Sequence, residues 1–133
     1  MHKIGLTAIL LALFITSCSN TVSPGQAASP QLIFILEGSG DSDVGMSTKT
    51  TESFHVSKTE WFIETNCEAL DSLNSVGLLA TVFPKDKSID GSYIGVVNQN
   101  NQGLDKNYFY GTGDFYLVIV AMNVKAWTIK VYQ

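Results

Sequence analysis

Arginine is absent from the 133 residues, and the positive charge comes from eight lysines against twelve aspartates and glutamates. A protein that binds duplex nucleic acid needs a basic surface to neutralise phosphates, so binding to DNA or RNA is disfavoured. The missing guanidinium also removes the bidentate donor that suits carboxylate and phosphate ligands best. We therefore expect neither a nucleic acid nor an anionic substrate as a partner.

Long apolar runs are also scarce, and the one at the start of the chain, residues 4–15, follows a short charged beginning that contains Lys3. A run of about a dozen residues is shorter than the roughly twenty that span a bilayer, and it is typical of the apolar core of an export signal. The apolar runs further along are all much shorter than a transmembrane helix requires. We therefore predict that residues 1–17 are a signal peptide that is cleaved from the mature chain.

Cysteine occurs only twice, as Cys18 and Cys67, and Cys18 closely follows this apolar segment. The stretch Ile15-Thr16-Ser17-Cys18 resembles the lipobox of bacterial lipoproteins, in which a branched apolar residue and two small residues precede the cysteine. The resemblance implies cleavage before Cys18, a diacylglyceryl group on its thiol and an acylated amino terminus, with palmitate as the expected fatty acid. Two or three acyl chains hold a protein stably on a membrane, at about 0.8 kcal/mol per buried methylene. The alternative is an ordinary signal peptide with an incidental cysteine.

The mature chain is accordingly expected to be lipid-anchored on the cell membrane, facing the periplasm or the extracellular space. Ser19, in place of the aspartate of an inner-membrane retention signal, favours the outer membrane in a two-membrane cell. Residues 18–30 comprise the lipidated cysteine and a small, polar, Pro- and Gly-containing tether that we predict to be disordered. The 103 residues from 31 to 133 suffice for one compact domain. Without Lys3, the mature chain has seven lysines and twelve acids, a net charge near −5.

Alternation of apolar and polar residues with a period of two dominates the chain after residue 31. It predicts eight short strands, over residues 32–37, 52–56, 60–66, 76–83, 92–98, 106–111, 114–123 and 126–132. We expect residues 57–59 to join two of these strands in a hairpin and residues 98–103 to form a polar turn. Residues 66–74 are the only candidate helix. This pattern is typical of an all-β fold, a single antiparallel β-sandwich that is jelly-roll-like.

The closing sequence GTGDFYLVIVAMNVKAWTIKVYQ, residues 111–133, resembles the last strands of small secreted bacterial jelly-roll modules. The nearest families are the pre-peptidase C-terminal domains and CUB-like sandwiches, and the resemblance implies an accessory or binding module rather than a catalyst. In some similar sandwiches a cysteine in the place of Cys67 is bridged to one just before the tryptophan of the final strand. This chain has Ala126 there, so we expect a buried, inert thiol, with intermolecular pairing as the alternative.

Catalytic sites of the Ser-His-Asp or Cys-His kind would have to use His55, the only histidine after the leader. In the predicted hairpin, residue 55 faces residue 62, which leaves Cys67 roughly 16 Å away at 3.3 Å per residue. Glu60 and Glu64 share a strand face but are spaced too far apart for the paired carboxylates of a glycosidase, which lie about 5–9 Å apart. We therefore predict no catalytic residues, with a small hydrolase as the least favoured alternative.

The acidic loop GSGDSDVG, residues 38–45, lacks the glycine spacing of a phosphate-binding loop. Asp41 and Asp43 alternate like the first ligands of a calcium loop, but the third acid and the closing glutamate are missing. Asp86 and Asp90 could complete a site only if two loops met. We interpret the segment as a solvated acidic turn, and we predict no cofactor and no metal, with calcium as the alternative.

Tyrosines are the other residues that suggest a binding surface. Tyr93, Tyr108 and Tyr110, with the amides Asn98 and Asn100, could form a platform on which sugars stack, although cross-strand aromatic pairing explains the same residues.

The predicted strand over residues 114–123 is apolar on both faces, and the face with Tyr116, Val118 and Val120 is either covered within the fold or meets a partner. We predict a non-enzymatic interaction or ligand-binding domain with a protein or glycan partner. The alternative is a carbohydrate- or calcium-binding accessory module for an enzyme.

Overall fold

The computed structural model describes residues 28–39, 46–70 and 75–133, and within them it contains nine β-strands and no helix. The predicted signal peptide, Cys18, the first part of the predicted tether and the pair Asp41 and Asp43 lie outside the described residues. The strands are β1 (Leu32–Ser39), β2 (Met46–Thr50), β3 (Phe54–Val56), β4 (Glu60–Ala69), β5 (Ser75–Pro84), β6 (Gly95–Asn101), β7 (Gly103–Tyr110), β8 (Gly113–Met122) and β9 (Val124–Tyr132).

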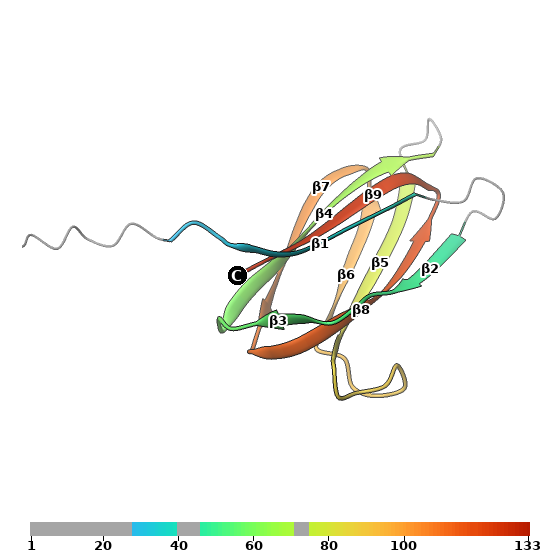
Figure 1. The fold of residues 1–133 in the computed structure, drawn as a ribbon. Helices are drawn as coiled ribbons and strands as arrows, with labels where there is room; N and C mark the ends of the chain where they lie inside the picture. Colours follow the sequence, from blue (N-terminus) through green and yellow to red (C-terminus); the bar gives the residue numbers. More distant parts are fainter. Residues whose placement is uncertain (1–27, 40–45, 71–74) are drawn as a thin grey trace, which may run out of the picture.

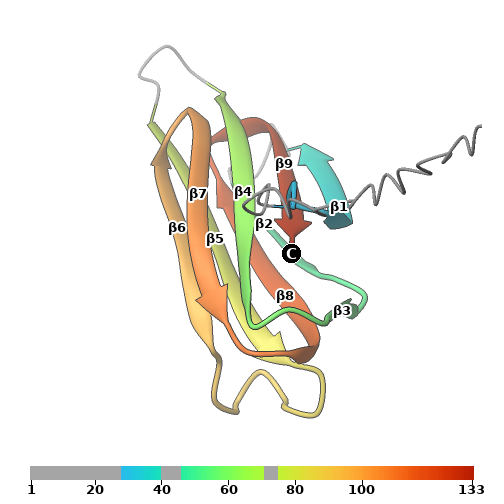
Figure 2. The same ribbon diagram turned by 90° about the vertical axis from the view of Figure 1, so that its left-hand side faces the viewer.

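The strands form two antiparallel sheets that pack face to face (Figure 1). Sheet A has the strand order β1-β9-β4-β7, and sheet B has the order β2-β8-β5-β6, with β3 also paired to β8. Figure 2 shows the strands spread side by side with sheet A toward the viewer, and the edge strands β6 and β7 lie next to each other on one side. The predicted all-β sandwich is confirmed.

The interior follows from the alternation of side chains along the strands, which points every second residue into the space between the sheets. On β8 the buried residues are Phe115, Leu117, Ile119 and Ala121, and on β4 they include Trp61 and Ile63. Trp61 lies at the centre of an aromatic cluster, with ring centroids 4.8 Å from Phe109 and 5.3 Å from Phe115. Its indole N–H donates to the carbonyl oxygen of Gly111 at 3.1 Å.

The predicted hairpin over residues 57–59 is wrong. β3 pairs with β8 in sheet B, whereas β4 pairs with β7 and β9 in sheet A, so this turn crosses from one sheet to the other. Phe54 and Val56 enter the core from sheet B, and Trp61 enters it from sheet A. Alternation alone identifies the buried face of each strand, but it carries no information about which sheet the strand joins.

The predicted helix over residues 66–74 is also wrong over its described part, because β4 continues to Ala69. Cys67 and Ala69 extend the alternating burial of Trp61, Ile63 and Thr65, and the backbone pairs with β7 on one side and β9 on the other. A short isolated helix is marginal in water, so the ladder of a central strand prevails over a weak helical pattern. Residues 71–74 lie outside the described residues.

The structure also differs from the prediction at β2 and at the turn between β6 and β7. β2 is an unpredicted ninth strand, and its sequence MSTKT shows no apolar alternation because it lies at the edge of sheet B. The polar turn predicted over residues 98–103 is narrower, since β6 runs to Asn101 and β7 begins at Gly103. Gly103 has a φ of 103°, a conformation that glycine adopts without strain, and this lets the chain pass abruptly from sheet B to sheet A.

Candidate functional site

A row of aromatic side chains crosses the outer face of sheet A. Tyr108 on β7, Phe62 on β4 and Tyr132 on β9 are direct cross-strand neighbours, and we call these three residues the aromatic row. The ring centroids of Phe62 and Tyr132 are 4.9 Å apart at an interplanar angle of 17°, and those of Phe62 and Tyr108 are 5.5 Å apart at 47°. Sequence reasoning identified only Tyr108, because the register between distant strands cannot be read from periodicity.

The rings of Phe62 and Tyr132 stack on each other along the aromatic row, whereas the ring of Tyr108 is tilted by 47° to that of Phe62. Neighbouring strands lie about 4.8 Å apart, and the nearly parallel rings of Phe62 and Tyr132 have almost the same spacing, so they stack along the row and present their edges outward. Tyr108 is on the edge strand of the sheet and is 57% exposed, which leaves its ring the most accessible of the row. The Lys106 ammonium lies 4.4 Å from the centroid of the Phe62 ring and adds a cation–π contact.

A shallow hollow of about 290 Å³ adjoins the aromatic row. Its lining consists of Ala28, Pro30, Lys58, Glu60, Trp61, Phe62, Tyr108 and Gln133. The hollow therefore combines aromatic walls with a carboxylate, an ammonium and an amide. Because residues 28 and 30 belong to the segment that precedes β1, the hollow lies where the chain leaves the domain toward Cys18.

The other residues of the predicted tyrosine platform are dispersed. Tyr110 is on β7 with Tyr108 and is 69% exposed, but Tyr93 packs against Phe83, with ring centroids 6.3 Å apart, in the segment between β5 and β6 of sheet B. Asn98 and Asn100 are on β6, also in sheet B. These residues therefore do not lie on one platform, and the cross-strand neighbours in the row of Tyr108 are Phe62 and Tyr132.

The second face of β8 carries Tyr116, Val118 and Val120. The Tyr116 ring stacks on Phe83 with centroids 5.4 Å apart, and its hydroxyl donates to the carbonyl oxygen of Lys87 at 2.9 Å. Val118 and Val120 further along the strand are only partly buried. Tyr116 thus has a stacking and a hydrogen-bond partner within the fold, and Tyr116, Val118 and Val120 are all partly buried among the described residues.

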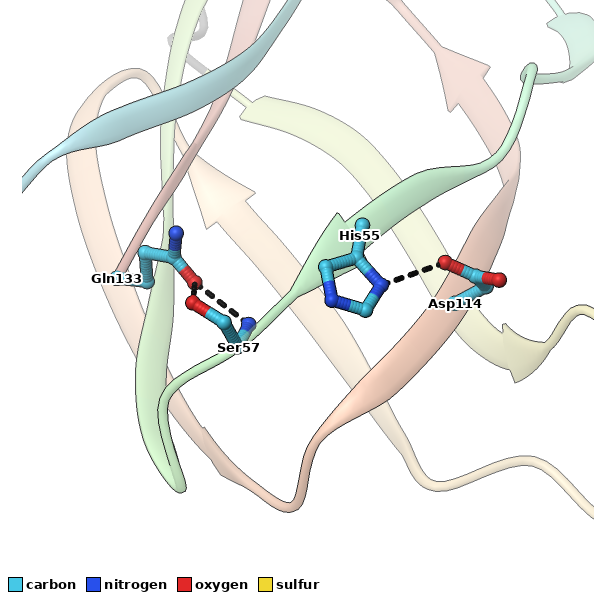
Figure 3. Close-up of polar contacts among 4 residues, drawn as sticks. All are labelled: His55, Ser57, Asp114 and Gln133. Carbon is cyan, nitrogen blue, oxygen red and sulfur yellow. Dashed lines mark hydrogen bonds and ion pairs between the residues drawn. The ribbon is translucent and has the colours of Figure 1, made fainter.

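His55 is exposed and its imidazole is hydrogen-bonded to the Asp114 carboxyl group, whereas the hairpin prediction placed it opposite residue 62. The Nδ1 atom of His55 lies 2.8 Å from Oδ1 of Asp114, a distance that also occurs between the base and the acid of a hydrolytic triad. Ser57 follows His55 by two residues, but its Oγ donates to Oε1 of Gln133 at 3.0 Å. Figure 3 shows the serine and the imidazole directed to different partners, so the described contacts place no serine nucleophile on this histidine.

Glu60 and Glu64, which the sequence placed on one strand face, both point outward from β4, and only Glu60 contributes to the hollow. Asp86 forms a 3.6 Å ion pair with Lys87, and Asp90 is an exposed residue of the same loop. Within residues 28–39, 46–70 and 75–133, no group of three or more histidines, cysteines, aspartates or glutamates could hold a metal ion. The same residues include no helix that is long and apolar enough to cross a membrane.

Cys67 is a buried free thiol on β4. Its Sγ donates to Oε1 of Gln99 at 3.3 Å, and the Gln99 amide nitrogen donates to the carbonyl oxygens of Asn101 and Gly103. A cavity of about 250 Å³ adjoins this amide-rich edge, and Gln99 is the one buried polar side chain in its lining. Both polar atoms of the Gln99 side chain already form the hydrogen bonds just described. Burial raises the pKa of the Cys67 thiol to about 11, with a further contribution from the carboxylate of Asp105.

The raised pKa of Cys67 predicts a loss of stability in strong alkali. Between the ordinary thiol pKa of about 9 and the folded value of about 11, the unfolded chain has released the proton while the folded chain retains it. The free energy of unfolding should therefore fall as pH rises through this range. A Cys67→Ala chain should lose less stability between pH 9 and pH 11 than the unmodified chain in urea titrations, and equal losses would contradict the assignment.

Comparison with known protein families, curated proteins and solved structures found no match to this chain.

Proposed function

We propose that this chain is a membrane-anchored lipoprotein whose β-sandwich is a non-enzymatic binding module that takes its ligand in the hollow beside the aromatic row. The observation that carries the proposal is the exposed ring of Tyr108 in a hollow of about 290 Å³ that also contains Lys58, Glu60 and Gln133. Aromatic walls with a few convergent polar groups are typical of small-ligand sites. The lipobox-like sequence that ends at Cys18 supports the anchor and a location facing the periplasm or the extracellular space.

A neutral glycan is the ligand class that this chemistry favours. The exposed ring of Tyr108 can stack on the C–H face of a sugar, and the Glu60 carboxylate can accept hydrogen bonds from sugar hydroxyls. The side-chain oxygen of Gln133 accepts hydrogen bonds from the backbone N–H and the hydroxyl of Ser57. Figure 3 shows the side-chain nitrogen of Gln133 directed away from Ser57. One ammonium and one carboxylate in the hollow balance each other, so the site has no net charge that would select an anion.

Replacing Tyr108 by alanine should weaken glycan binding about tenfold, because a stacked ring contributes roughly 1 kcal/mol or more. Tyr93→Ala is a matched control, since Tyr93 is 58% exposed and Tyr108 is 57% exposed, but Tyr93 lies in the loop between β5 and β6 and does not line the hollow. The probes are two neutral hexasaccharides, one of β-linked glucose and one of N-acetylglucosamine. Each is titrated into the protein, and binding is measured by the change in intrinsic protein fluorescence. If neither probe binds, the glycan assignment fails, and equal losses in both variants would exclude the hollow as the site.

A further inference from the structure

A second hollow lies on the outer face of sheet A, further along β4 than the hollow beside the aromatic row. Its volume is about 130 Å³, and we call it the polar hollow. β4 lies between β9 and β7 in the sheet (Figure 2), and all three strands contribute to the polar hollow together with the edge strand β1. The residues that line it are Glu37, Glu64, Asn66, Leu104, Thr128 and Lys130.

The two hollows adjoin each other along β4. Every second side chain of a strand points to the same face, and the consecutive outward residues of β4 are Glu60, Phe62, Glu64 and Asn66. The first two of these residues line the hollow beside the aromatic row, and the next two line the polar hollow. Between residues 60 and 66 the strand advances by roughly 20 Å, at 3.3 Å per residue. The two hollows therefore form one elongated surface.

The polar side chains of the polar hollow are free to bind a ligand. In the part of the chain that the structure describes, no hydrogen bond or ion pair involves the side chains of Glu64, Asn66 or Thr128, and the same holds for Glu37 and Lys130. An ammonium group only donates hydrogen bonds and a carboxylate only accepts them, whereas an amide and a hydroxyl group do both. A ligand rich in hydroxyl groups, each of which can donate and accept, can use all of these side chains.

The charges on this elongated surface balance. The hollow beside the aromatic row contains one ammonium and one carboxylate group. The polar hollow contains the carboxylates of Glu37 and Glu64 and the ammonium of Lys130. Lys106 is the cross-strand neighbour of Glu64 on β7 and adds a second ammonium beside them. The surface therefore selects neither an anion nor a cation and is suited to a neutral, polar ligand.

We propose that a neutral glycan chain binds along β4 and occupies both hollows, so that the site takes an extended oligosaccharide rather than a single sugar. The inference rests on the proposed function, because the exposed ring of Tyr108 supplies the stacking contact at one end. An added peptide strand would need free backbone groups, but the backbone of β4 is paired with β7 on one side and with β9 on the other. A protein partner would need an apolar or aromatic anchor, and the only apolar residue that lines the polar hollow is Leu104.

The length of the oligosaccharide and a variant of the polar hollow together test the proposal. Disaccharides and hexasaccharides of β-linked glucose and of N-acetylglucosamine are titrated by calorimetry into the full chain, extracted from membranes in a detergent without a sugar headgroup. A hexasaccharide should bind about tenfold more tightly than the disaccharide, because only the longer chain forms hydrogen bonds in both hollows. Asn66→Ala should weaken hexasaccharide binding about fivefold, the effect of one hydrogen bond, and leave disaccharide binding unchanged. Unchanged disaccharide binding also shows that the variant is folded.

Thr128→Val, which keeps the shape of the side chain, should show the same pattern as Asn66→Ala. Asn98→Ala is the matched control, since Asn98 is also an exposed asparagine but lies on β6 in sheet B, and it should bind both lengths as the unmodified chain does. Tyr108→Ala should weaken the binding of both lengths. Equal affinities for the two lengths, or equal losses for both in Asn66→Ala, would overturn the extended site and leave the proposed function standing as long as binding depends on Tyr108. If neither length binds, the proposed function fails and the extended site fails with it.

Discussion

A Cys18→Ser chain is expected to incorporate no labelled palmitate, whereas the unmodified chain incorporates it fully. The lipobox-like sequence implies that the Cys18 thiol is the acceptor of the diacylglyceryl group, and a serine hydroxyl cannot form the thioether. The loss should be complete, because each acyl chain depends on the modification of this residue. Metabolic labelling followed by immunoprecipitation gives the measurement.

Cys67→Ser is the matched control for this experiment. Cys67 is the only other cysteine and is buried in the sandwich, so its replacement should leave palmitate incorporation unchanged. Label that persists in the Cys18→Ser chain would contradict the assignment of Cys18 as the lipidation site. Label that disappears only in the Cys67→Ser chain would contradict it equally.

Replacing Trp61 by alanine is expected to destabilise the domain by about 3–5 kcal/mol, the usual cost of truncating a large core aromatic residue. Trp61 is 1% exposed and contacts Phe54, Phe109 and Phe115, so its removal opens a cavity between the sheets. The variant also loses the hydrogen bond to the Gly111 carbonyl at the β7–β8 connection. Since typical domains are stable by only about 5–15 kcal/mol, this loss removes a large share of the stability.

Urea unfolding followed by circular dichroism measures the effect of Trp61→Ala. Tyr110→Ala is the control, because Tyr110 is 69% exposed and its truncation should change stability by less than about 0.5 kcal/mol. Equal midpoints for the two variants would show that the aromatic cluster around Trp61 does not hold the sheets together. The same outcome would place the main core contacts elsewhere in the sandwich.

The buried faces of the strands could be predicted from the sequence because they follow directly from alternation. Trp61 and Ile63 on β4 and the buried residues of β8 are where the period of two puts them. The pairing partner of β3 could not be predicted, since a strand with one buried face satisfies either sheet equally well. The end of β4 could not be predicted, because the alternation through Cys67 and Ala69 competes with a short helical spacing and the pairing of β4 with β7 and β9 decides the outcome.

The candidate site was only partly predictable for the same reason. Tyr108 stood out as a tyrosine in a strand, but its neighbours Phe62 and Tyr132 come from strands that are far apart in the sequence. Sequence proximity groups Tyr93 and Asn98 with Tyr108, although Tyr93 lies in the loop between β5 and β6 and Asn98 lies on β6 in the other sheet. Register between distant strands depends on the packing of the whole sandwich and leaves no local signature.

The most direct test of the account is the intact mass of the native protein extracted from membranes. We predict a chain that begins at Cys18, comprises 116 residues and carries the additional mass of a diacylglyceryl group and an amide-linked fatty acid. An unmodified chain, or one that still begins at Met1, would contradict the proposal that the protein is a membrane-anchored binding module.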